Sequence, residues 1–302
     1  MTKLRAYQVD SFTNQPYSGN PAGVVANAEG LSAIQMQRIA RELNNSETAF
    51  ILPADGADHD MIVRFFTPTA EVPSCGHATI AANFVRAFER GGANQTLVQK
   101  TGAGLMPIAV EATEHGPRIS MTQAKPTLDA PLAVDICERI WAALGQSNGA
   151  RRDLPAQVVS TGHSKVMLPY QTRELVDALV PDMPALAALS AEIGCNGFFP
   201  FAIGKQGDRN LVYGRMFGPA IGIAEDPVTG NANGPVGAYL AHHGFAPSGD
   251  APFCFTGLQG VAMGRPGHVD VKVTRSGQTP LSVTISGTAV LVFSTEIPAP
   301  QL

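Results

Sequence analysis

Residues 64–79 read RFFTPTAEVPSCGHAT, and their landmarks return in residues 215–233, which read RMFGPAIGIAEDPVTGNAN. An Arg-X-Phe-X-Pro run opens each copy, and a glycine before an apolar run follows at Gly76 and at Gly230. A Thr-Gly pair comes later in both, at residues 101–102 and 256–257, so three landmarks recur in the same order with nearly the same offset. A repeat at this long spacing predicts a duplicated domain.

Each glycine precedes an apolar helix. Residues 78–90 leave almost no polar face, and residues 232–243 end before Gly244, a residue suited to a helix C-terminus. Runs rich in β-branched and aromatic residues surround both segments and predict strands; they are Arg5–Phe12, Ala49–Pro53, Ile62–Phe66 and Leu105–Glu111, then Gln157–Thr161, Gly197–Ile203, Leu211–Phe217, Val269–Thr274 and Leu281–Phe293. We expect each apolar helix to be buried among strands.

The copies divide the chain into two domains. Two amphipathic segments, residues 32–44 and 134–144, predict packing helices, and a polar linker between Pro126 and Pro131 predicts the boundary. The expected domains are residues 1–125 and 126–302, and the last strand is a candidate for crossing back to the first domain.

The composition predicts a cytoplasmic protein that binds neither nucleic acid nor membrane. The 302 residues are 44% hydrophobic and 15% charged, with a net charge of −4 and no basic run interleaved with aromatics. The first residues lack the apolar run of a signal peptide, and no segment approaches a membrane span. The cysteines, Cys75, Cys137, Cys195 and Cys254, lie far apart with no CxxC pair, so they predict individual reduced thiols rather than a zinc site or disulfides.

The two glycine turns are candidate anion sites. A helix N-terminus offers unpaired N–H groups and the positive end of a dipole, which suit a carboxylate. An isolated glycine more often serves only tight turn geometry. Because the turn occurs twice, at Gly76 and at Gly230, we favour the binding interpretation.

Single polar residues near these turns are candidates for proton transfer. Glu47 enters an apolar strand, where burial would raise its pKa and suit it to act as acid and then base; a capping or surface glutamate is the ordinary alternative. His77 follows Gly76, where the helix dipole favours neutral imidazole, and Asp226 precedes the second turn, where aspartate is also a common cap. Asp10 and the turn-forming Gly19-Asn20-Pro21 are equally open to a structural reading.

Cys75 supports a second hypothesis. A thiol beside a helix N-terminus can become a nucleophile or base. A racemase with two thiols would need a cysteine in the second copy, and Thr229 stands there beside Gly230.

Several motifs together resemble the PhzF-like phenazine-biosynthesis isomerases, relatives of diaminopimelate epimerase. The matching segments follow the family's order over most of the chain; they are residues 7–12 (YQVDSF), 19–24 (GNPAGV), 46–50 (SETAF), 75–78 (CGHA) and 225–230 (EDPVTG). The resemblance implies an α+β fold of two pseudo-symmetric diaminopimelate epimerase-like domains, each a β-barrel around a central helix, with the active site in the cleft between them.

The resemblance also implies the roles of the site residues. Glu47 matches the proton-shuttling glutamate, His77 and Asp226 match assisting residues, and the amides of Gly76 and Gly230 match donors to a substrate carboxylate. Asn20 and Asn231 are further expected substrate contacts. The expected reaction is an isomerisation like that of trans-2,3-dihydro-3-hydroxyanthranilate, with a small carboxylate as the only partner, no cofactor and no metal; family members are often homodimers.

Two residues depart from the family pattern and leave the substrate open. Asn231 stands where serine is frequent, and Cys75 is more typical of the epimerase branch. A cysteine-dependent racemase or epimerase and a non-catalytic binder of small carboxylates therefore remain as alternatives.

Overall fold

The computed structural model describes residues 3–91, 94–145, 150 and 153–301. The chain forms two compact units, unit 1 (residues 1–122 and 286–302) and unit 2 (residues 123–285). The boundary expected from the sequence, between residues 125 and 126, lies close to the change of unit at residue 122.

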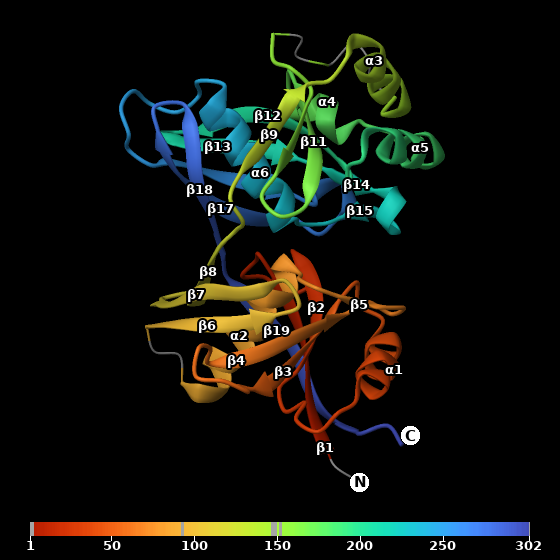
Figure 1. Cartoon of the computed structure of the whole chain (residues 1–302), viewed down its shortest axis with the longest axis vertical. Helices are drawn as coiled ribbons and strands as arrows, with labels where there is room; N and C mark the ends of the chain where they lie inside the picture. Colours follow the sequence, from red (N-terminus) through yellow and green to blue (C-terminus); the bar gives the residue numbers. More distant parts are fainter. Residues whose placement is uncertain (1–2, 92–93, 146–149, 151–152, 302) are drawn as a thin grey trace. The chain divides into compact units, whose positions relative to one another are not determined.

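Unit 1 consists of the amino-terminal part of the chain and its last strand. Its elements are β1 (Lys3–Ser11), β2 (Asn20–Val25), α1 (Ala33–Leu43), β3 (Thr48–Pro53), β4 (Met61–Phe66), β5 (Glu71–Val72), α2 (Gly76–Arg90), β6 (Gln95–Thr101), β7 (Gly104–Thr113), β8 (Gly116–Thr122) and β19 (Ala289–Pro298). Strand β19 runs antiparallel to β1 with Lys3 opposite Pro298, so both ends of the chain lie close together (Figure 1).

Unit 2 holds the intervening residues. Its elements are β9 (Thr127–Pro131), α3 (Val134–Ala143), β10 (Gln157–Ser160), β11 (Ser164–Tyr170), α4 (Arg173–Asp177), α5 (Met183–Ile193), β12 (Phe198–Gln206), β13 (Arg209–Gly214), β14 (Met216–Gly218), β15 (Ile223–Asp226), α6 (Gly230–His242), β16 (Phe253–Gln259), β17 (Gly267–Ser276) and β18 (Thr279–Gly287), whose last two residues belong to unit 1.

The two units share one strand topology, which confirms the duplication. In unit 1 the successive pairs β1–β2, β2–β3, β3–β4, β4–β6 and β6–β7 run antiparallel, parallel, antiparallel, parallel and antiparallel. In unit 2 the pairs β10–β11, β11–β12, β12–β13, β13–β16 and β16–β17 repeat that order. Each parallel pair needs a crossover, and helices provide it.

The predicted central helices are confirmed. Helix α2 contacts β1, β2, β3, β4, β8 and β19, and α6 contacts β10, β11, β16 and β17 (Figure 1). Ile80, Val85 and Val236 are fully buried on these helices. Burying one such side chain contributes about 1.5–3 kcal/mol, so packing against the strands stabilises both helices.

Local signals set the ends of several helices. Ser32 and Gln35 form a reciprocal capping box at the start of α1, and Asn44 ends that helix in the left-handed conformation with φ 52°. Helix α2 begins at Gly76 rather than Ala78, and α6 begins at Gly230 rather than Ala232. Both glycines are therefore the first helical residues.

Three sequence expectations are wrong in detail. The expected linker contains β9, which pairs with β10 through Pro131 and Gln157. The run 211–217 is two strands, β13 and β14, separated at Arg215; both pair with β12, and Arg215 still donates its backbone N–H to Pro200 O on that strand. The run 281–293 is also two strands, interrupted at Thr288, whose carbonyl accepts from Phe12 N.

Candidate active site

Glu47 lies in unit 1 immediately before β3. Helix α1 ends three residues earlier, at Asn44. The Glu47 carbonyl accepts a hydrogen bond from Gly23 N at 3.2 Å, which ties Glu47 to strand β2. Its side chain is 13% exposed. The glutamate is therefore neither a surface residue nor a helix cap, which are the two roles that the ordinary interpretation of the sequence assigned to it.

His77 faces Glu47 from the first turn of α2. Glu47 Oε2 lies 3.4 Å from His77 Nε2, and Ser46 Oγ lies 3.3 Å from the same nitrogen. The other ring nitrogen, Nδ1, lies 3.4 Å from Cys75 Sγ. The fold thus brings a carboxylate, an imidazole and a thiol together, all largely buried.

The start of α2 is shaped to accept a ligand. Cys75 is the N-cap residue, yet its side chain makes no capping hydrogen bond, so it leaves the first-turn N–H groups without that partner. Apart from the neighbours Cys75 and His77 and the backbone of α2 itself, no described atom lies within 4 Å of the point where a Cβ on Gly76 would stand. Space therefore exists beside the positive end of a buried helix, next to Glu47 and His77.

Asn20 is connected to this cluster through β1. It is buried at the start of β2, and the strand register places it opposite Ser11. Ser11 Oγ donates to His77 O at 2.8 Å. The structure thus places Asn20 one strand away from the residue that anchors His77.

The Asp10 side chain has a structural role. Its Oδ2 accepts from Tyr17 N at 2.7 Å, which holds the turn between β1 and β2. Tyr17 adopts a positive φ of 68°, a conformation that such a bond helps to maintain.

Asp226 belongs to a hydrogen-bond network in unit 2. The Thr229 hydroxyl donates to Asp226 Oδ2, and Gln259 Nε2 donates to Asp226 O at 2.7 Å. Gln259 Oε1 accepts from Thr229 N at 3.1 Å and from Asn233 Nδ2 at 3.1 Å. These bonds fix the turn that leads into α6.

Gly230 and Asn231 are held by Gln123. Gln123 Nε2 donates to Gly230 O at 3.1 Å and to Asn231 Oδ1 at 2.8 Å. Gln123 fits because a side chain on Gly234 would occupy its place. Asn231 departs from helical geometry, with φ −77° and ψ 15°, so the first turn of α6 is kinked.

The structure separates the predicted site residues into two clusters. Asn20, Glu47, Gly76 and His77 gather in unit 1, whereas Asp226, Gly230 and Asn231 gather in unit 2. Cys75, weighed separately in the sequence, belongs to the first cluster.

Sequence reasoning missed the residues that position these clusters. Ser46 and Ser11 contact His77, and Gln123 and Gln259 hold the start of α6. Lys165 on β11 is 2% exposed, and burial lowers its pKa to about 8. The signals were weak: serine and glutamine are common surface residues, and only the lysine stands out, in the largely apolar run 165–170.

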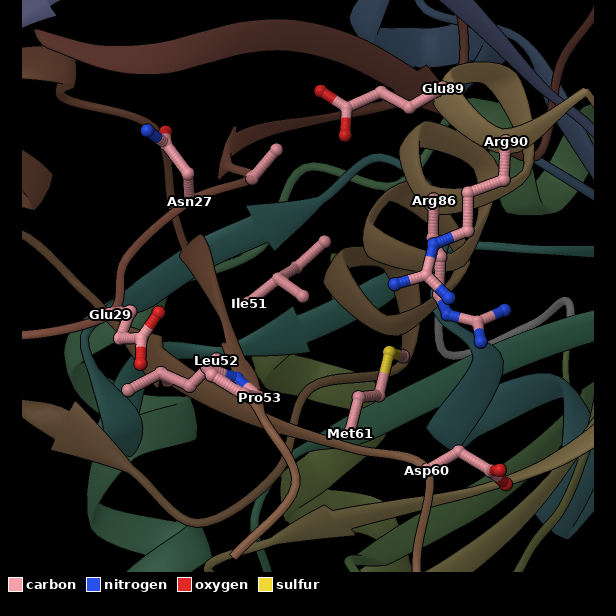
Figure 2. Close-up of a pocket in the computed structure, with 11 residues that line it drawn as sticks. Asn27, Glu29, Ile51, Leu52, Pro53, Asp60, Met61, Arg86, Glu89 and Arg90 are labelled. Carbon is pink, nitrogen blue, oxygen red and sulfur yellow. The ribbon is translucent and has the colours of Figure 1, made fainter.

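A pocket of about 250 Å³ lies at the far end of α2 (Figure 2). Arg86 and Arg90 line one side, with Glu29, Asp60 and Glu89 among the remaining lining residues. None of the predicted site residues lines it. Its lining combines both signs of charge.

The helices of the described residues include none with the length and apolar character needed to cross a bilayer.

A duplicated barrel around buried helices, with polar clusters at the start of each helix, defines the diaminopimelate epimerase-like class of fold, as the sequence predicted. The chain belongs to the phenazine biosynthesis-like protein family, PhzC-PhzF, whose profile matches residues 9–295.

Relatives and a solved structure agree with this assignment. The chain is 50% identical to the "Uncharacterized isomerase YddE" of Escherichia coli K12 over 295 residues, covering 97% of this chain and 98% of the relative. It is 33% identical over 284 residues to a trans-2,3-dihydro-3-hydroxyanthranilate isomerase of Pseudomonas chlororaphis, covering 93% and 95%. The crystal structure of a Bacillus anthracis PhzF-family protein superposes with a TM-score of 0.87 at 31% identity, covering 99% and 100%. The protein is therefore an isomerase, which makes a non-catalytic binder the wrong description.

Proposed function

We propose that this isomerase moves a proton on a small carboxylate-bearing substrate, with Glu47 as the acid and base. The observation that carries the proposal is the 3.4 Å approach of Glu47 Oε2 to His77 Nε2 at the buried start of α2. A carboxylate with little water around it can take a proton from carbon and return it to a second position. His77 supplies a neighbouring donor or acceptor that steadies both protonation states.

The start of α2 is the proposed site for the substrate carboxylate. The N–H groups of the first turn and the open space beside Gly76 suit an anion. Binding there would also stabilise negative charge that develops at the adjacent carbon during proton removal. The assisting role expected for Asp226, and the substrate contacts expected of Asn20, Gly230 and Asn231, stay predictions.

The substrate class follows from the relative named for trans-2,3-dihydro-3-hydroxyanthranilate isomerisation. We take that compound, a carboxylate with a transferable carbon-bound proton, as the first substrate to test. Small amino and hydroxy acids form the rest of the panel, because a helix N-terminus recognises the carboxylate and not the remainder of the molecule.

A thiol mechanism is the second candidate. It is supported by the 3.4 Å contact of Cys75 Sγ with His77 Nδ1, which would deprotonate the thiol. Against it, the residue that caps α6 in the duplicated unit is Thr229, so no second thiol matches Cys75 there.

The test is exchange of carbon-bound hydrogen in D2O, followed by NMR. Wild type should show turnover or deuterium uptake, and Glu47→Gln should reduce either by about 10³-fold or more, since the amide keeps the shape of the side chain but cannot accept the proton. Glu42→Gln, an exposed glutamate on α1, is the matched control and should react like wild type. Undiminished turnover in Glu47→Gln would overturn the proposal.

A further inference from the structure

Three side chains of different metal-binding chemistry converge at the start of α2. One ligand atom each from Glu47, Cys75 and His77 lies within 4.8 Å of the other two. Cys75 Sγ lies 3.4 Å from His77 Nδ1, and Glu47 Oε2 lies 3.4 Å from the other ring nitrogen, Nε2. We propose that these three residues bind a thiophilic divalent cation such as Zn²⁺, and that the bound cation reversibly inhibits the isomerase.

The distances allow a cation with small side-chain adjustments. Zinc bonds of about 2.0–2.3 Å place tetrahedral ligands roughly 3.3–3.6 Å apart. Because a cation binds only one of the two ring nitrogens, one of the 3.4 Å contacts already has this spacing, and the other separations, which lie within 4.8 Å, must close by about 1 Å through side-chain rotation. One imidazole nitrogen serves the cation, and the hydrogen bond or ion pair it made before is replaced.

The backbone at two ligands is already fixed. Cys75 O accepts from Thr79 N at 3.0 Å and from Thr79 Oγ1 at 2.7 Å. His77 O accepts from Ser11 Oγ at 2.8 Å. Because these carbonyls are anchored, binding orders only side chains, which lowers its entropic cost.

The donor set selects the kind of cation. A thiolate and an imidazole favour Zn²⁺ and similar ions over Mg²⁺ and Ca²⁺, which prefer oxygen ligands. The thiolate and the carboxylate together balance a double positive charge. The helix dipole opposes a cation only weakly compared with direct coordination by a thiolate and a carboxylate.

A three-ligand site keeps a further coordination position for water. The open space beside Gly76, between Cys75 and His77 in the chain, offers room for it. Binding releases the thiol proton to solvent and changes no oxidation state.

Inhibition rests on the proposed function, whereas binding does not. A cation on Glu47 and His77 would prevent the glutamate from accepting a carbon-bound proton. Chelation would restore the free carboxylate, so the inhibition should be reversible.

Cobalt titration tests the binding directly. Co²⁺ added to the full-length wild type should produce a thiolate-to-cobalt charge-transfer band that saturates at one equivalent and that Zn²⁺ displaces. Cys75→Ser should lose the band, and His77→Gln should weaken binding at least tenfold. Cys254→Ser is the matched control, because Cys254 is exposed and distant in sequence, and it should keep the band. A band that survives in Cys75→Ser, or that never forms, would overturn the inference.

Turnover measured with Zn²⁺ separates this inference from the proposed function. Zinc should inhibit wild type and Cys254→Ser equally, and EDTA should reverse it. If Co²⁺ binds through Cys75 while zinc leaves turnover unchanged, the inhibition is rejected but the binding site stands, and the Glu47→Gln result alone decides the role of Glu47. If Glu47→Gln abolishes turnover and Co²⁺ gives no band, the proposed function stands and the cation site is rejected.

Discussion

Arg215 and Glu225 form a bidentate ion pair in unit 2, in which the distances from Nε to Oε1 and from Nη2 to Oε2 are both 2.8 Å. Arg64 and Glu71 form the same pair in unit 1, with both distances at 2.7 Å. In unit 1 the pair joins β4 to the short strand β5, and in unit 2 it joins the residue between β13 and β14 to the short strand β15. The duplication therefore extends from strand topology to a matched side-chain pair.

The two pairs differ in burial, which predicts different contributions to stability. The side chains of Arg215 and Glu225 are 9% and 15% exposed, whereas those of Arg64 and Glu71 are 29% and 43% exposed. Arg215→Ala should lower the free energy of unfolding by about 3–5 kcal/mol, because it leaves a buried carboxylate unpaired. Arg64→Ala should cost about 1 kcal/mol or less.

Urea denaturation followed by circular dichroism measures both losses. Arg215→Lys should recover only part of the lost free energy of unfolding, because an ammonium group cannot form the bidentate pair that the guanidinium forms with Glu225. Arg215 Nη1 also donates to Leu179 O at 2.8 Å. Equal losses for the two alanine variants would contradict the difference assigned to burial.

Gly76→Ala should separate ligand binding from stability. Apart from its chain neighbours and the backbone of α2, no described atom lies within 4 Å of the added methyl, and the residue begins a helix. The melting temperature should stay the same or rise slightly, because alanine favours helix. The KM should rise at least tenfold, about 1.4 kcal/mol of lost binding, because the methyl takes the space of the substrate carboxylate.

Gly237→Ala on the other central helix provides the opposite case. Its methyl would meet Val271 at 2.9 Å and Val273 at 3.0 Å. Overpacking should lower stability by about 1–2 kcal/mol without a specific change in KM. An unchanged KM in Gly76→Ala would show that the space beside Gly76 holds no substrate.

The fold could be predicted because its signals are local and occur twice. The run from Arg64 to Pro68, the glycine at 76 and the apolar helix after it each have a local physical meaning, and their return near residue 215 indicates a second domain. The details that failed depend on tertiary contacts. Arg215 separates β13 from β14 and pairs with Glu225, and nothing in a β-rich run indicates either feature.

The site was harder to predict because spatial proximity decides it. Glu47 and His77 are thirty residues apart, and each alone has an ordinary structural interpretation; the family motifs singled them out, and the fold brings them to 3.4 Å. Gln123 and Gln259 could not be found from sequence, since each reaches its turn from a distant segment of unit 2. Neither glutamine belongs to a sequence pattern that would single it out.

Alkylation tests the thiol mechanism without mutating the site. Cys75, Cys137 and Cys195 are 6–7% exposed, whereas Cys254 is exposed. A short treatment with iodoacetamide should therefore label Cys254 and leave turnover unchanged, with the label located by peptide mass spectrometry. Cys254→Ser should remove nearly all labelling. Loss of turnover together with label on Cys75 would instead favour the thiol mechanism.

Lys165 should make the stability of the protein depend on alkaline pH. Burial lowers its pKa from 10.5 to about 8, and the charges of Cys195 and Asp226 offset only part of this effect. Between pH 8 and 10.5 the unfolded chain holds the lysine proton and the folded chain releases it, so unfolding becomes less favourable as the pH rises. Below pH 8 both states hold the proton, and the full cost of the buried charge remains, on the order of 3 kcal/mol.

Lys165→Met removes that pH-dependent cost while keeping most of the apolar volume. The stability of the variant relative to wild type should therefore be greatest at pH 7 and should decline steadily between pH 8 and 10.5. Melting curves of both proteins at each pH isolate the contribution of Lys165 to stability, because all other groups titrate in both proteins. The exposed Lys205→Met is the control and should differ from its parent by a constant amount. A relative stability of Lys165→Met that stays flat across this range would mean that Lys165 keeps its proton in the folded protein, and that the nearby negative charges outweigh its burial.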